Sequence, residues 1–172
     1  MNLEIQNRQR AVKVNARAVR RLAVWLLRLA ERRDSRAAAW GSVTVVLCDD
    51  AGMAAVNRVH LGRDATTDVI VYRYDPQPGD PAAIDGDLLV NVERALAEAT
   101  QRSCVGGPDA ELALYLAHAC DHLAGADDDT PARRRAMRQR ELAWRRRARY
   151  AGLTQGLIDQ TPTGGRAARR AP

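Results

Sequence analysis

The chain has 172 residues, 46% of them hydrophobic, and a formal net charge of +6. This length favours one domain over two, and no apolar run approaches the ~20 residues that span a bilayer, which excludes a helical membrane protein. The N-terminal MNLEIQNRQR lacks the apolar stretch of a secretory signal, so we expect a cytoplasmic protein with no membrane partner.

The predicted elements alternate between strand and helix along much of the chain. Strand 42–47 (SVTVVL) is rich in β-branched residues, and helix 16–33 carries apolar residues at spacings of three and four. Thr130-Pro131 marks the start of the last helix, because Pro is favoured in a first turn. In chain order we predict an edge strand 3–9, helix 16–33, strand 42–47, helix 51–60, strands 67–74 and 86–92, and helices 93–102, 110–124 and 131–150.

This order predicts an α+β fold. We expect a single two-layer domain over residues 1–150, with a small mixed four-stranded sheet and about five helices. The consecutive strands 67–74 and 86–92 should form an antiparallel hairpin, and the rest of the sheet can contain a parallel pair joined by a helical crossover. Residues 151–172 are polar, glycine-rich and basic, and we expect much of this tail to be disordered.

The charges are segregated along the chain. Residues 1–36 and 131–172 carry net charges of +7 and +10, whereas residues 37–130 carry −11. Acidic groups attract cations and arginines attract phosphate, which favours a metal site in the middle of the chain and phosphate contacts in the basic arms. Arginine-rich helices can also be simple solvated faces, and the charges alone leave both interpretations open.

The cysteines do not indicate a metal or redox site. Cys48, Cys104 and Cys120 are scattered, and none forms a CxxC pair. We expect reduced thiols that pack as small hydrophobic groups. Cys120 lies between two histidines but on a different face of the predicted helix.

The most informative stretch is LALYLAHACDHLAGADDD, residues 112–129. His118 and His122 are four residues apart on a predicted helix, so both imidazoles can point at one ion. Gly125 can end the helix, and the acidic run 127–129 then brings carboxylate oxygens back to the same point. We predict a three-ligand metal site, in which spacing alone leaves open whether Asp127, Asp128 or Asp129 is the third ligand.

A zinc peptidase with an HExxH motif needs a glutamate next to its first histidine. In this chain Ala119 occupies that position. The substitution argues against a metalloprotease, although a metal-dependent hydrolase of another substrate remains an alternative.

Three blocks of the chain resemble the YbeY family of bacterial rRNA maturation factors, over about residues 3–150. The family motif H-G-x-L-H-L-x-G-Y-D-H is matched at His118, His122, Leu123, Gly125 and Asp127. The block VNRVHLGRDATTDVIVYRYD is similar to a second family element, with matches at Asn57, Asp64, Thr67, Asp68 and Val69. The block GDLLVNVERALAEA resembles the family's G-D-[IL]-x-I-[SN] strand and the helix after it.

The resemblance implies one divalent metal ion, with zinc expected, held by His118, His122 and Asp128. The family's third histidine falls on Asp128, and a carboxylate oxygen can bind zinc. The extra negative charge should weaken the metal as a Lewis acid and raise the pKa of its bound water. The family's arginine before the T-D-V strand falls on Leu61, which removes an expected phosphate contact.

The resemblance also implies a metal-dependent endoribonuclease in rRNA maturation or ribosome quality control, with ribosomal RNA and ribosomal subunit proteins as partners. Metal-bound water would be the reacting group. Asp68 and Asp121 are candidates to orient the metal ligands by contacts with the ligand side chains. One alternative is a non-catalytic RNA- or ribosome-associated module with a structural or empty metal site.

Overall fold

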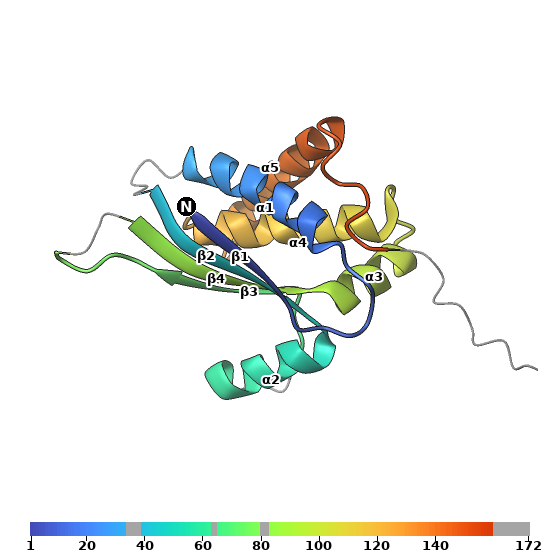
Figure 1. The fold of residues 1–172 in the computed structure, drawn as a ribbon, viewed down its shortest axis with the longest axis horizontal. Helices are drawn as coiled ribbons and strands as arrows, with labels where there is room; N and C mark the ends of the chain where they lie inside the picture. Colours follow the sequence, from blue (N-terminus) through green and yellow to red (C-terminus); the bar gives the residue numbers. More distant parts are fainter. Residues whose placement is uncertain (34–38, 63–64, 80–82, 160–172) are drawn as a thin grey trace, which may run out of the picture.

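The computed structural model describes residues 1–33, 39–62, 65–79 and 83–159. All nine predicted elements are present there with the predicted type, and their ends move by a few residues. The elements are β1 (Asn2–Asn7), α1 (Ala16–Glu31), β2 (Ala39–Cys48), α2 (Asp50–Leu61), β3 (Val69–Tyr74), β4 (Ala83–Asn91), α3 (Val92–Gln101), α4 (Gly107–Leu123) and α5 (Pro131–Tyr150) (Figure 1).

The four strands form one mixed sheet in the order β1-β2-β4-β3. β1 lies at an edge and pairs in parallel with β2 after the α1 crossover, and β2 pairs in parallel with β4. β3 pairs with β4 in the predicted antiparallel hairpin. The α+β class, the mixed four-stranded sheet and the five helices are therefore confirmed within the described residues.

Helices α1, α4 and α5 lie on one side of the sheet, and α2 lies on the other (Figure 1). The main core fills the space between the sheet and the three helices, with Leu22, Leu47, Leu88 and Leu116 fully buried. A second, smaller cluster of Val46, Cys48, Met53 and Leu89 lies on the other face of the sheet. No helix in the described ranges is long and apolar enough to cross a membrane.

Helix α4 lies at the centre of the helical layer, and it is apolar on nearly every side because sheet and helices surround it. Gly86 of β4 allows the sheet to approach the end of this helix. A Cβ atom at Gly86 would collide with the side chain of Leu123. The close approach places His122, the residue before Leu123, directly beside the sheet.

The packed chain continues past the predicted domain end at residue 150. In the segment 151–159, Leu157 and Ile158 are buried in the main core. The backbone N–H of Ile158 also donates to the Asp109 carboxylate over 2.7 Å. These nine residues of the predicted tail therefore pack with the domain, because Leu157 and Ile158 are buried in its core; residues 160–172 of the tail lie outside the described part.

Candidate metal site

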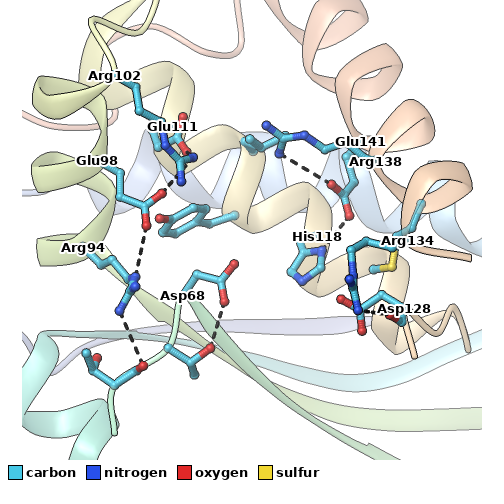
Figure 2. A pocket seen from close by; sticks show the side chains of 15 residues that line it. Asp68, Arg94, Glu98, Arg102, Glu111, His118, Asp128, Arg134, Arg138 and Glu141 are labelled. Carbon is cyan, nitrogen blue, oxygen red and sulfur yellow. Dashed lines mark hydrogen bonds and ion pairs between the residues drawn. The ribbon is translucent and has the colours of Figure 1, made fainter. Parts of the chain in front are cut away.

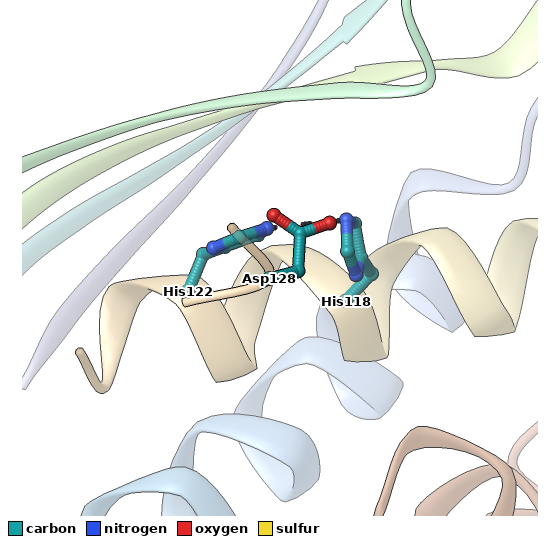
Figure 3. Close-up of side chains that lie close together, drawn as sticks. All are labelled: His118, His122 and Asp128. Carbon is teal, nitrogen blue, oxygen red and sulfur yellow. Dashed lines mark hydrogen bonds between the residues drawn. The ribbon is translucent and has the colours of Figure 1, made fainter. Parts of the chain in front are cut away.

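The three predicted ligands lie together at the end of α4 (Figure 3). The Nε2 atoms of His118 and His122 are 3.2 Å apart, and an Asp128 carboxylate oxygen completes a group of three ligand atoms that lie within 4.8 Å of one another. Two imidazole nitrogens on one tetrahedral zinc ion, each bonded at 2.0–2.1 Å, are separated by ~3.3 Å. The histidine spacing therefore suits a shared ion.

Gly125 turns the chain back toward the histidines. Its φ of +75° is in the left-handed region that glycine adopts at little cost. The N–H of Ala126 donates to the carbonyl of Asp121 over 3.0 Å and closes the turn. The helix therefore ends within one turn of His122, and the acidic segment passes beside both imidazoles.

The three acids of that segment have different surroundings. Asp127 and Asp129 are exposed, and both pair with Arg133, at 3.4 and 3.0 Å. Arg133 thus holds these two carboxylates on the outside of the turn. Asp128, between them, is half-buried and joins the histidines.

Both imidazoles are held by their Nδ1 atoms. Nδ1 of His118 lies 2.6 Å from Oε1 of Glu141, and Nδ1 of His122 lies 3.0 Å from the carbonyl oxygen of Ala126. Carboxylates and carbonyls accept hydrogen bonds, so each Nδ1 donates. The lone pair of each neutral ring is then on Nε2, which is the atom that faces the shared point.

The surroundings of His118 attract positive charge. Burial lowers its pKa, but the hydrogen bond and charge of Glu141, followed by the charges of Asp68 and Asp128, outweigh burial and hold the pKa above its ordinary value of 6.5. Two lone pairs 3.2 Å apart repel each other unless a cation or a proton lies between them. The donor set and its geometry therefore suit a divalent ion.

Glu141 is a site residue that sequence reasoning missed. It is buried on the inner face of α5, where Met137, Trp144 and Ala148 pack toward the domain. The missed signal was that Glu141 is the one acid among nine arginines in this helix. A lone acid at a position of core spacing needs a buried partner, and here the partner is His118, one of the three predicted metal ligands.

Asp68 stands at the start of β3, next to the ligand group. Its Oδ1 accepts hydrogen bonds from the Thr67 hydroxyl at 2.9 Å and the Val69 N–H at 3.0 Å. Buried Asn91 fixes this segment, since its N–H donates to the carbonyl of Asp68 over 2.8 Å. Asp68 lines the same hollow as His118, but its described hydrogen bonds are with Thr67 and Val69 rather than with an imidazole (Figure 2).

Asp121, the other predicted supporting residue, is paired with arginines rather than with a metal ligand. Its fully buried carboxylate lies 3.0 Å from Arg33 and 2.9 Å from Arg140. It therefore joins α4 to the segment that follows α1 and to α5, and its described ion pairs are with these two arginines rather than with the histidines. The side chain of Leu61 and all of Asp64 lie outside the described residues.

Two hollows adjoin the ligand group and share Thr67, Asp68, His118 and Asp128. The larger, about 500 Å³, lies between α3, α4 and α5 (Figure 2). The smaller, about 410 Å³, lies between β3 and α4 and is bordered by Arg73. A metal ion held by the three ligands would border both hollows.

Known proteins resemble this chain along most of its length. The family model described as "Endoribonuclease YbeY" matches residues 4–148. Relatives with that name in Rhodopirellula baltica and Anaeromyxobacter sp. (strain Fw109-5) are 40% and 37% identical, over 60% and 66% of this chain. The matched parts span 52% and 63% of those relatives' own lengths. A third, from Anaeromyxobacter dehalogenans, is 32% identical over 81% of this chain and 74% of its own length.

A solved structure has the same fold. The solution structure of TM1509 from Thermotoga maritima superposes with a TM-score of 0.57 and covers 95% of this chain and 99% of its own. The two sequences are 15% identical, so this likeness concerns the fold alone.

Proposed function

The chain belongs to the YbeY family, and from this premise we propose that it is a metal-dependent endoribonuclease of rRNA maturation or ribosome quality control. The observation that carries the proposal is the group of His118, His122 and Asp128 with both Nε2 atoms directed at one point. Ribosomal RNA is the proposed substrate, ribosomal subunit proteins are the proposed neighbours, and the cytoplasm is the proposed location.

Zinc is the proposed ion, held by His118, His122 and Asp128. When bound, it supplies a Lewis acid that activates water and polarises a phosphoryl oxygen. The Asp128 carboxylate adds a negative charge that a histidine ligand would lack, which predicts a higher pKa for the activated water than at a site with three histidines.

The surrounding residues have separate tasks in this proposal. Glu141 holds the His118 ring by accepting from Nδ1, and the Ala126 carbonyl does the same for His122. Asp68 keeps its Oδ2 oxygen for proton transfer, since its two described hydrogen bonds both use Oδ1. A carboxylate beside the reacting atoms can accept the proton of the attacking water and return it to the leaving oxygen.

Metal content and RNA cleavage together test the proposal. The purified wild-type protein should contain a divalent ion and cut an rRNA fragment, and a chelator should abolish the cutting until metal is restored. Asp128→Ala should lose both metal and activity. Asp129→Ala is the matched control, because this neighbouring carboxylate is exposed and pairs with Arg133 outside the ligand group.

Three results would contradict the proposal. Protein that stays free of metal after incubation with zinc, manganese or magnesium would rule out the ligand group. Metal-loaded protein that binds RNA without cutting it would instead favour the non-catalytic RNA-binding module. Cutting of a peptide, but not of RNA, would favour a hydrolase of another substrate.

A further inference from the structure

One face of α5 borders the larger hollow. Arg134, Met137, Arg138 and Glu141 follow the spacing of a single helical face, and all four line the hollow. Met137 and Glu141 are buried, whereas Arg134 and Arg138 are exposed at the opening. The face that holds His118 through Glu141 thus also places two cations beside the ligand group (Figure 2).

The two arginines on the opposite wall are neutralised within the protein. Arg94 of α3 and Arg102, the residue that follows this helix, both pair with Glu98, at 3.2 and 3.0 Å. Arg102 also lies 3.6 Å from the buried Glu111. These ion pairs join α3 to α4 and leave little charge for a ligand.

Arg134 differs from them in its partners. Its Nη2 donates to the backbone carbonyl of Asp128 over 3.1 Å, and no carboxylate within the described ranges pairs with it. Arg138 is 4.0 Å from Glu141, whose other oxygen already accepts from His118. A guanidinium group has five N–H donors, so Arg134 keeps most of them for a ligand.

The charges of the hollow suit one phosphate group. Its lining contains five carboxylates and four guanidinium groups, which gives a formal charge of −1. A bound divalent ion would change this to +1, and one phosphodiester would then neutralise it. Among the four arginines of the lining, Arg134 is the one that pairs with no carboxylate of the described residues, so the excess positive charge lies at its end of the hollow.

We propose that Arg134, assisted by Arg138, binds the phosphodiester of the RNA at the metal site. This inference rests on the proposed function and names a substrate contact for it. The planar guanidinium fork matches two phosphate oxygens. The contact of Arg134 with the Asp128 carbonyl keeps that fork beside the ligand group, so the phosphate lies between the ligands and α5.

Arginine-to-glutamine variants test the contact with a single-stranded rRNA oligonucleotide. Arg134→Gln should lower kcat/KM by about 100-fold, the usual loss for a missing group that stabilises transition-state charge. The double variant with Arg138→Gln should lose more, and the salt dependence of RNA binding should fall by about one counterion for each lost contact. Arg147→Gln is the matched control, because it removes the same charge from an exposed position of α5 that does not border the hollow.

Metal content and circular dichroism must be measured on every variant. Unchanged metal with reduced RNA affinity supports a phosphate contact. A loss of metal in Arg134→Gln would overturn it, since the arginine would then serve to hold the Asp128 loop.

The two proposals fail in different ways. If the wild type cuts RNA and the double variant cuts it equally well, with the same salt dependence, the phosphate contact is wrong and the endoribonuclease stands. If the metal-loaded wild type does not cut RNA, the proposed function fails. Binding of the oligonucleotide then still decides the contact: weaker binding by Arg134→Gln than by Arg147→Gln supports it, and equal binding overturns it.

Discussion

The Glu141 carboxylate lies 2.6 Å from Nδ1 of His118, although 23 residues separate them in the chain. This bond links α5 to α4 at the metal site. It orients the imidazole so that Nε2 faces His122. It also places a negative charge at the Nδ1 side of the ring, opposite the Nε2 atom that we propose binds the metal ion. We therefore expect the metal affinity of the proposed site to depend on the docking of α5 as well as on α4, which carries the two histidines.

Glu141→Ala should weaken metal binding by about 10- to 100-fold, the usual effect of removing a group that orients a ligand. Glu141→Gln should weaken it less, because its amide oxygen can still accept from Nδ1 while the charge is lost. Competition with a chromophoric chelator measures both affinities.

Asp127→Asn is the control for the Glu141 variants, since it removes an exposed carboxylate close to the same site. Equal affinities for the wild type and Glu141→Ala would show that the hydrogen bond does not serve the metal. Urea unfolding of each variant separates a change in affinity from a general loss of structure.

Metal binding should weaken as the pH falls, because protons and the metal compete for Nε2 of His118. The neighbouring carboxylates hold the pKa of His118 above 6.5, so the competing proton is already present at a higher pH than on an ordinary histidine. The loss of affinity should accordingly begin above pH 6.5, and in Glu141→Gln it should begin at lower pH. Metal titrations at a series of pH values around and above 6.5 give the pH at which the affinity begins to fall. The same pH in the wild type and in Glu141→Gln would contradict the role of Glu141.

Asp68→Asn should retain metal and lose activity, by about 100-fold or more, because an amide cannot take up a proton at neutral pH. The amide oxygen can still accept from Thr67 and Val69, so the local structure should persist. Single-turnover cleavage of metal-loaded protein is the measurement. Activity close to that of the wild type would exclude Asp68 from proton transfer.

Asp121→Ala should lower the free energy of unfolding by about 3 kcal/mol, because it leaves two arginines without their buried partner. The carboxylate is fully buried, and Arg33 and Arg140 both contact it. Urea denaturation followed by circular dichroism measures the change, with the exposed Asp127→Asn as the reference. Similar midpoints for the two variants would refute the structural role of Asp121.

Local pattern was enough to predict the elements and to bring together two of the proposed ligands. The spacing of His118 and His122 places them on one face of any helix. The run of β-branched residues at 42–47 strongly favours a strand, and it forms part of the largely buried β2. The mixed sheet followed from the order of the elements, and the third ligand from the register of the family motif. These inferences concern residues close together in the chain, where backbone geometry limits the outcomes.

Contacts between distant segments needed the tertiary structure. Residue spacing left Asp127, Asp128 and Asp129 open, and only the register of the family motif favoured Asp128. The contacts that separate the three acids are tertiary, because Arg133 of the next helix pairs with Asp127 and Asp129. The packing of the segment 151–159 was missed for a related reason. Its few apolar side chains form no local pattern, and their burial depends on contacts with core residues far away in the sequence.

The sequence by itself determined the helix that carries the two histidines, the glycine that ends it and the acidic turn that follows. Only the tertiary structure decided what stands behind and around them: Glu141 at His118, Asp68 at the hollow, and Arg134 beside Asp128. The physical reason is that helix periodicity acts over one or two turns, whereas hydrogen bonds and charges act between whatever groups the packed helices and sheet bring within a few ångströms.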